Sequence, residues 1–198
     1  MLTREEVAAV LARPERHFFR VLFRLTYHCG MRLGEVIRLA PGDLDEAAGR
    51  IHIRFAKGGK PRYVPATPEM FDEIRRFYVR HNNPLWLFPG LGQGWKRLKI
   101  TAEQAAFRSK THVSDSAVQN AFKVCVQESG IGKPAHLHTL RHCYATHLLE
   151  EGVSIRLISQ YMGHASLNPT IIYTHLTAVS EEQTREALAR LYKQSRSK

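Results

Sequence analysis

Four side chains in the last third of this 198-residue chain are of the types that phosphoryl transfer uses. His138 and Arg141 lie three residues apart, His164 follows, and Tyr173 lies nine residues beyond His164. Apolar residues around the first pair repeat at helical spacing until Gly152, which predicts a helix with His138 and Arg141 on one face. These two side chains can therefore reach one ligand together.

The chemistry that suits this set is attack on a phosphodiester. An arginine fork binds a phosphate through paired hydrogen bonds, and a histidine can donate a hydrogen bond or a proton to its oxygens. A tyrosine hydroxyl has an unperturbed pKa of about 10, so it becomes a nucleophile only where fixed positive charge surrounds it. The same spacing is also compatible with an ordinary helical domain that has histidines and an aromatic residue in its core.

The stretch resembles the catalytic signature of the tyrosine recombinases, the family of phage integrases and Xer-type recombinases. The family pattern is H-x-x-R-H, then L-G-H, then Y-T-H. This chain has HTLRH, MGH and IYTH, with Met162 where leucine is usual. The resemblance implies that Tyr173 attacks the scissile phosphate. It also implies that Arg141 holds the non-bridging oxygens, that His138 assists proton movement at the nucleophile, and that His164 hydrogen-bonds the phosphate.

A second catalytic arginine follows from the same resemblance. The family carries it in a G-x-R-x-x-E stretch, which residues 30–35 match with Arg32 at the arginine position. Gly34 stands where serine or threonine is more usual, and Glu35 is expected to orient neighbouring groups without a catalytic role. Taken without the resemblance, Arg32 could equally be a surface arginine.

Residues 50–66 alternate apolar and polar side chains around a Lys-Gly-Gly-Lys turn, and the apolar series is Ile51, Ile53, Phe55 and Tyr63. This alternation predicts a β-hairpin.

The family's catalytic lysine lies on such a hairpin, in a G-K-G-x-K-x-R pattern that residues 56–62 match with Ala56 in place of the first glycine. The match assigns Lys57 as the general acid that protonates the departing 5′-oxygen, provided that its pKa is lowered by burial or by neighbouring arginines. Lys60 and Arg62 are expected to contact the phosphate backbone of DNA. Exposed lysines at a hairpin tip are otherwise usually just solvated.

Residues 91–113 form a basic stretch with no clear periodicity. Lys96, Arg97 and Lys99 are its central cations, and we expect them to contact the DNA backbone. An ordinary solvated loop is an equally good interpretation of this stretch.

Charge is the most informative feature of the composition. Lys and Arg number 29 against 18 Asp and Glu, which gives a net charge of +11 and favours a polyanionic partner such as nucleic acid. The hydrophobic content of 43% is ordinary for a soluble globular protein, and no apolar run approaches the roughly 20 residues of a membrane span. Three widely spaced cysteines and the lack of a visible secretory signal predict a cytoplasmic protein with reduced, buried thiols. The resemblance implies a prokaryotic-type protein that acts at the nucleoid.

Apolar residues at helical spacing predict helices over about 16–29, 68–81 and 114–130, and in the last of these Val118, Ala121, Phe122 and Cys125 are expected to face the core. Together with the single hairpin, these helices predict an α+β fold that is mostly α-helical with a small antiparallel sheet. The resemblance implies the tyrosine recombinase catalytic-domain fold, with residues 1–198 as one catalytic domain. Full-length members usually have a helical DNA-clamping domain ahead of it, so we expect this chain to be a fragment cut at the interdomain linker. Residues 177–198 are predicted to form a C-terminal helix and tail, a candidate for docking on a neighbouring protomer.

The predicted function is site-specific DNA cleavage and rejoining through a 3′-phosphotyrosine, without a cofactor. The expected partners are double-stranded DNA and further copies of the chain, as a tetramer on DNA and a monomer alone. A type IB topoisomerase-like activity and a non-catalytic DNA-binding module are the alternatives. The spacing of four within the pairs His138/His142 and Cys143/His147 would also suit metal ligands. We favour no metal, because His138 already has a catalytic assignment and the family uses none.

Overall fold

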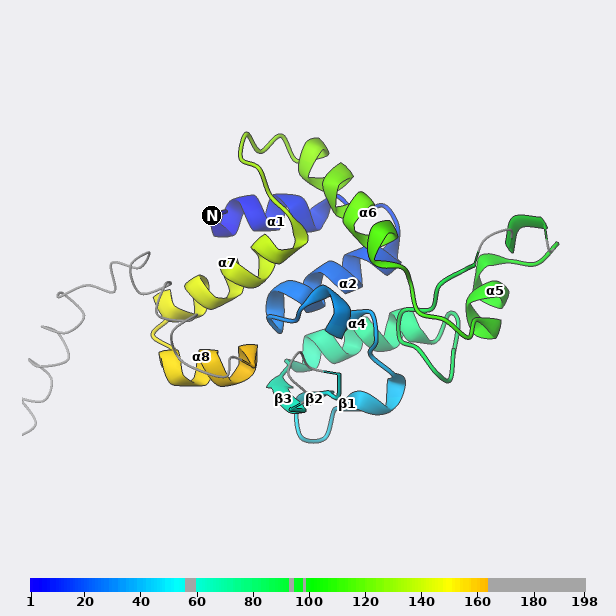
Figure 1. Ribbon diagram of the computed structural model, residues 1–198, viewed down its shortest axis with the longest axis horizontal. Coiled ribbons are helices and arrows are strands. Elements are labelled where there is room, and N and C mark those ends of the chain that lie inside the picture. The colour runs from blue at the N-terminus through cyan, green and yellow to red at the C-terminus, as the bar shows by residue number, and fades with distance from the viewer. Residues whose placement is uncertain (56–59, 93–94, 98, 164–198) are drawn as a thin grey trace, which may run out of the picture. The chain divides into compact units, whose positions relative to one another are not determined.

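The structure is a computed structural model that describes residues 1–55, 60–92, 95–97 and 99–163 (Figure 1). The chain divides into two compact units, Met1–Tyr144 and Ala145–Lys198, and helix α7 crosses the boundary between them. The elements in order are α1 (Arg4–Ala12), α2 (His17–His28), α3 (Leu33–Val36), η1 (Pro41–Asp43), β1 (Leu44–Asp45), β2 (Arg50–Ile53), β3 (Arg62–Pro65), α4 (Pro68–Tyr78), η2 (Trp95–Arg97), α5 (Ala102–Arg108), α6 (Asp115–Glu128), α7 (Leu137–Glu150) and α8 (Ile155–Met162).

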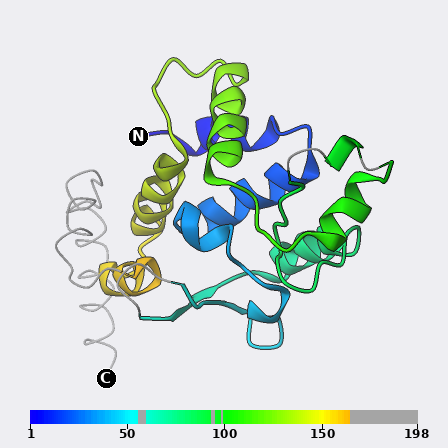
Figure 2. The same cartoon turned by 45° about the vertical axis from the view of Figure 1, so that its right-hand side comes forward.

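Helix α2 is the centre of the first unit. It packs against α1, α3, α4 and α6, and it lies between α1 and α6 on one side and α4 with the sheet on the other (Figures 1 and 2). Its residues Val21–Phe23 and Leu25 are fully buried, and the ring of Phe23 meets that of Phe122 on α6 edge to face at 5.2 Å. Burial of these large side chains supplies most of the driving force for this packing.

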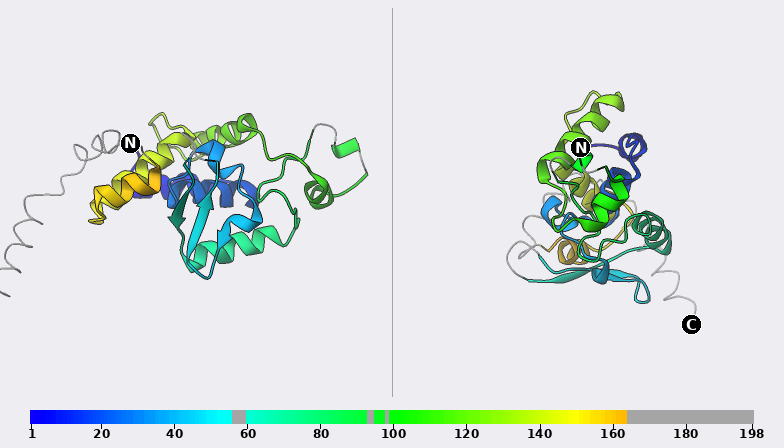
Figure 3. Two further views of the ribbon diagram at one scale, coloured as in Figure 1. Left: turned by 60° about the horizontal axis from the view of Figure 1, so that its bottom comes forward. Right: turned by 90° about the vertical axis from the view of Figure 1, so that its right-hand side faces the viewer.

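The three strands form one antiparallel sheet in the order β1-β2-β3, a thin layer along one side of the first unit (Figure 3). Ile51 pairs with Val64, and Ile53 pairs with Arg62. Residues that pair directly project from the same face, so Arg62 shares the inner face with three buried aliphatic side chains. The structure thus confirms a mostly helical α+β fold with a small antiparallel sheet.

Two residues of the predicted apolar series are exposed: Phe55, which follows the end of β2, and Tyr63. Tyr63 continues the apolar series of residues 51–55, yet its side chain is 47% exposed and stacks on His52 across the strands at 4.6 Å. Pairing register decides this outcome, because a shift of one residue exchanges the two faces of a strand. In the observed register Arg62 and Val64 take the inner positions.

Residues 91–113 have more structure than their sequence predicts. They contain η2 and α5, and Thr101 and Gln104 form a capping box at the start of α5. The fully buried Asn83 fixes the end of α5 through hydrogen bonds from Nδ2 to the carbonyls of Ala106 (2.7 Å) and Ser109 (2.8 Å).

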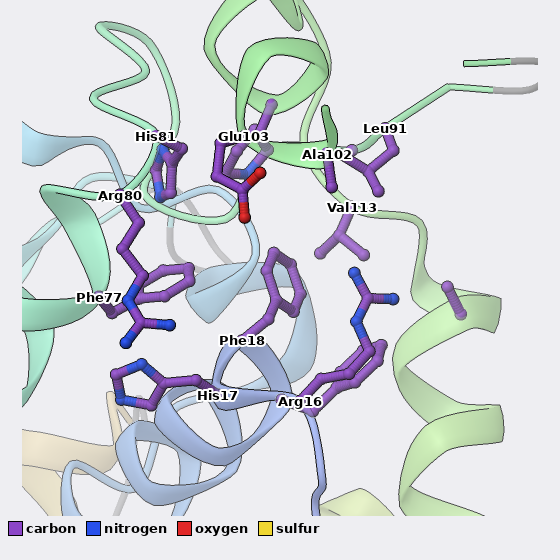
Figure 4. A pocket seen from close by; sticks show the side chains of 15 residues that line it. Arg16, His17, Phe18, Phe77, Arg80, His81, Leu91, Ala102, Glu103 and Val113 are labelled. Atoms are coloured by element: carbon purple, nitrogen blue, oxygen red, sulfur yellow. The ribbon is translucent and has the colours of Figure 1, made fainter. Parts of the chain in front are cut away.

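An aromatic cluster lies beside α5. Phe18, Phe77 and Phe88 contact one another with ring centroids 5.5–5.7 Å apart, and a cavity of about 420 Å³ opens next to them. Figure 4 shows Phe18 near the centre of this cavity, with His17 and Arg80 to one side of it. The cavity shares no residue with the arginine cluster described below.

The described part of the second unit is short. It comprises the end of α7, a turn at Gly152, and α8, which Ser154 caps at its start and Gly163 ends in a left-handed conformation. None of the helices in the described ranges has both the length and the apolar character that a bilayer crossing requires.

Candidate active site

The first component of the site is the turn after α2. Gly30 has φ +58°, and a Cβ atom at this position would lie 2.4 Å from Cδ1 of Tyr144. Only glycine meets both requirements without strain. The carbonyl of Gly30 accepts a hydrogen bond from Nη1 of Arg141, so the turn holds an arginine that is 111 residues away in the sequence.

The carboxylate of Glu35 is the centre of an arginine cluster. Oε1 accepts hydrogen bonds from Nη1 of Arg62 at 2.9 Å and Nη1 of Arg32 at 3.1 Å. Oε2 accepts from Nη2 of Arg62 at 2.7 Å and from the backbone N–H of Arg32 at 2.9 Å. Nη1 of Arg141 lies 4.0 Å from Oε2. Helix α3, strand β3 and helix α7 thus bring Arg32, Arg62 and Arg141 to one carboxylate; we call these four side chains the Glu35 cluster.

Exposure differs sharply within the Glu35 cluster. The side chains of Glu35 and Arg141 are 2% and 1% exposed, and that of Arg62 is 8% exposed, whereas Arg32 is 25% exposed. Burial raises the pKa of Glu35, but the hydrogen bond and charge of Arg62, with smaller contributions from Arg32 and Arg141, outweigh it and hold the pKa below 4.5. Glu35 is therefore ionised at neutral pH, and the four side chains together carry a net charge of +2.

His138 is exposed at the start of α7, and its ring lies 4.6 Å from that of His142 at a right angle. Loss of hydration around the ring lowers the pKa of His138 below 6.5, and the charges of His142, Arg141 and Arg32 lower it further. The imidazole is therefore neutral at pH 7. In that form one ring nitrogen can accept a proton.

A cavity of about 550 Å³ borders His138. Its walls also include Met31 and Leu33, the two sequence neighbours of Arg32. The exposed face of α6 adds polar side chains to the lining: Gln119, Asn120, Lys123 and Gln127.

Sequence reasoning missed the polar side chains of α6, because only the apolar side of this helix was interpreted. The signal was present, since these residues repeat at helical spacing opposite the buried Val118, Phe122 and Cys125.

The remaining predicted site residues lie in different surroundings. Lys57, His164 and Tyr173 are outside the described residues. Lys60, Lys96, Arg97 and Lys99 are exposed, as a contact with the DNA backbone requires. Their contacts with DNA, like the catalytic roles, stay predictions.

The described ranges contain no group of three or more His, Cys, Asp or Glu side chains arranged to hold a metal ion.

The sequence of this chain is similar to those of known DNA recombinases. The sequence profile of the phage integrase family matches residues 1–179. The chain is 34% identical to the tyrosine recombinase XerA of Thermococcus kodakarensis, over 93% of this chain and 61% of that protein. It spans less than two thirds of the length of the curated relatives that it matches first.

Solved structures have the same fold. The crystal structure of XerA recombinase aligns with all of this chain and 64% of its own, at 25% identity and a TM-score of 0.72. XerH site-specific recombinase, in a post-cleavage complex with its palindromic difH substrate, aligns over 95% of this chain and 52% of its own, at 22% identity and a TM-score of 0.71.

Proposed function

This chain belongs to the phage integrase family, and on that premise we propose that it cleaves and rejoins DNA strands through a covalent 3′-phosphotyrosine, as a site-specific recombinase. The observation that carries the proposal is the Glu35 cluster. Arg32 and Arg141 match the family's two catalytic arginines, are 109 positions apart in the sequence, and yet lie around one carboxylate.

The arginines act on the charge that develops during phosphoryl transfer. Arg32 and Arg141 hold the non-bridging oxygens of the scissile phosphate and stabilise the pentacoordinate transition state, as metal ions do in other phosphoryl-transfer enzymes. Support comes from the anchoring of both side chains, Arg141 on the Gly30 carbonyl and Arg32 on Glu35. These bonds form during folding, so both guanidiniums are held in place before DNA binds.

The covalent step follows from the roles that the family resemblance implies. The phenol oxygen of Tyr173 bonds to phosphorus as the bond between phosphorus and the 5′-oxygen breaks. His138 assists removal of the phenol proton, and Lys57 supplies a proton to the departing oxygen. His164 hydrogen-bonds the phosphate. Attack by a 5′-hydroxyl on the phosphotyrosine reverses the sequence and rejoins the strand, so the energy of the original ester is conserved and no cofactor is required.

Duplex DNA is the proposed partner, bound over the cavity beside His138. The amide groups of Gln119 and Asn120 can hydrogen-bond base edges, whereas Lys123 suits a phosphate or a guanine. Lys60, Lys96, Arg97 and Lys99 supply further phosphate contacts. From the family resemblance we propose four copies on DNA, a monomer in its absence, and action in the cytoplasm, where prokaryotic DNA is located.

Covalent capture tests the proposed function directly. Duplexes with a randomised central sequence and a strand nick release a short fragment after cleavage, which traps the protein on the DNA. We expect the wild-type chain to give a denaturant-resistant adduct, and sequencing of the trapped DNA identifies the preferred site.

The matched variant is Tyr173→Phe, which removes one oxygen and keeps the ring. Its binding to the captured duplex should match that of the wild type, while the adduct disappears. An equal adduct yield from the Phe variant would show that another residue is the nucleophile.

A further inference from the structure

Arg62 is unlike the other basic residues that the sequence assigns to the DNA backbone. Its side chain is 8% exposed, whereas Lys60, two residues earlier, is exposed. The hairpin register places Arg62 opposite Ile53 on the inner face of the sheet. Its two Nη groups donate to the two oxygens of Glu35 at 2.9 and 2.7 Å, the bidentate geometry of a guanidinium and a carboxylate.

The guanidinium of Arg62 determines the orientation of the Glu35 carboxylate that Arg32 contacts. A bidentate pair fixes both the plane and the position of the carboxylate. Arg32 then donates one side-chain hydrogen bond to Glu35, at 3.1 Å, and remains 25% exposed. Its guanidinium is therefore oriented by Glu35 without being enclosed by it.

Removal of Arg62 would leave a buried carboxylate without its main partner. A buried charge without a partner is costly, so we expect the nearest remaining guanidiniums to move toward it. Arg32 already donates one bond to Glu35, and Arg141 is 4.0 Å away. If the guanidinium of Arg32 or of Arg141 turned fully onto Glu35, its positive charge would point away from the phosphate site.

We propose that Arg62 is a positioning residue of the active site: it satisfies Glu35 and thereby leaves the guanidinium of Arg32 directed at the scissile phosphate. This inference rests on the proposed recombinase function. It reassigns Arg62 from a contact with the DNA backbone to a buried partner of Glu35 that controls the phosphate-binding arginine.

The first test compares single and double variants by single-turnover adduct formation on the captured site. Arg62→Met removes both hydrogen bonds from the guanidinium to Glu35 and should lower the rate by up to about 10²–10³-fold, the range for loss of one preorganised donor. Arg62→Lys keeps a charge without the fork and should also be slow. In Glu35→Gln/Arg62→Met the competing carboxylate is neutral, so the rate should exceed that of Arg62→Met alone.

A second measurement separates positioning from general damage to the fold. A methylphosphonate at the scissile position lacks the negative charge that Arg32 neutralises. On this substrate the gap between wild type and Arg62→Met should shrink to within about threefold. An equal gap on both substrates, or full activity of Arg62→Lys, would overturn the inference.

A third measurement tests the backbone-contact alternative. Each phosphate contact contributes about 0.9 to the slope of log affinity against log salt concentration. Lys60→Met should therefore reduce this slope, whereas Arg62→Met should leave it unchanged; a reduced slope for Arg62→Met would make it a DNA contact. If the wild-type chain forms no adduct on an ordinary phosphodiester, the proposed function fails first, whatever the Arg62 variants do.

Discussion

At the scale of single residues, charge state decides what each group in the site can do. Glu35 is held ionised by Arg62 and its other arginine neighbours, despite its burial. His138 is held neutral by loss of hydration and by nearby positive charge. An ionised carboxylate orients guanidiniums, and a neutral imidazole accepts a proton. Loss of hydration is the main cause for His138, and nearby positive charge favours both forms that the proposed reaction needs.

The lowered pKa of His138 predicts the acid limb of the pH–rate profile. A depressed pKa means that the neutral imidazole persists to lower pH. The rate of adduct formation should then be flat near pH 7 and fall as the pH drops through a value below 6.5. Single-turnover rates from pH 4.5 to 8 measure this midpoint.

His138→Gln is the control for that profile. Glutamine does not titrate, so the variant should react more slowly, and its rate should no longer show the fall at acid pH that is assigned to His138. A wild-type midpoint above 6.5 would mean that the pKa of His138 is raised in the working enzyme, contrary to the effect of the ring's surroundings.

At the scale of elements, short connections do most of the positioning. The turn after α2 brings the Gly30 carbonyl to Arg141. Helix α3 is only four residues long, and it places Glu35 beside Arg32, its N-cap residue. Strand β3 adds Arg62 through its register with β2. The site is thus assembled at element ends, where small backbone changes have large effects on side-chain position.

Gly30→Ala tests this dependence. The left-handed backbone and the approach of Tyr144 each oppose a Cβ atom, so we expect a loss of about 1–3 kcal/mol in the free energy of unfolding. Denaturant unfolding measures this loss. The rate of adduct formation should fall as well, because the carbonyl that anchors Arg141 moves.

Gly132→Ala is the matched control, since a Cβ at Gly132 meets no atom within 4 Å. We expect this variant to stay within about 0.5 kcal/mol of the wild type, the usual range for surface changes. If both alanine variants were equally stable, the tight turn would not be a requirement of the fold.

At the scale of the whole molecule, we expect net charge to dominate the non-specific binding of this chain to DNA. The excess of 11 positive charges predicts non-specific duplex binding that weakens steeply with salt, because bound counterions are released from the DNA. This chain spans 61% of the length of the XerA relative.

We therefore expect the isolated chain to bind duplexes at roughly 10⁻⁴–10⁻⁶ M at physiological salt, with little preference for the captured site over a scrambled one. Sedimentation should show a monomer without DNA. Salt titrations on both duplexes measure the first expectation. Nanomolar, site-selective binding by a stable tetramer would contradict both.

Much of the local structure could be predicted from the sequence, because it depends on neighbours within a few residues. Helical spacing and capping residues predict α2, α4 and α6. The alternation of residues 50–66 predicts the hairpin, since turn and strand signals are local as well. The candidate positions Arg32, His138 and Arg141 followed from motif matches, which also require only short stretches of sequence.

Tertiary structure decided the contacts that join distant parts of the chain. Arg62 meets Glu35 across 27 residues, and Arg141 meets Gly30 across 111. No local pattern encodes either contact, because strand register and helix packing determine them. In sequence Arg62 is one more cation in a basic hairpin, and only the register of β3 turns it inward. The polar face of α6 can likewise be recognised from the sequence, but only the tertiary structure shows that it borders the cavity beside His138.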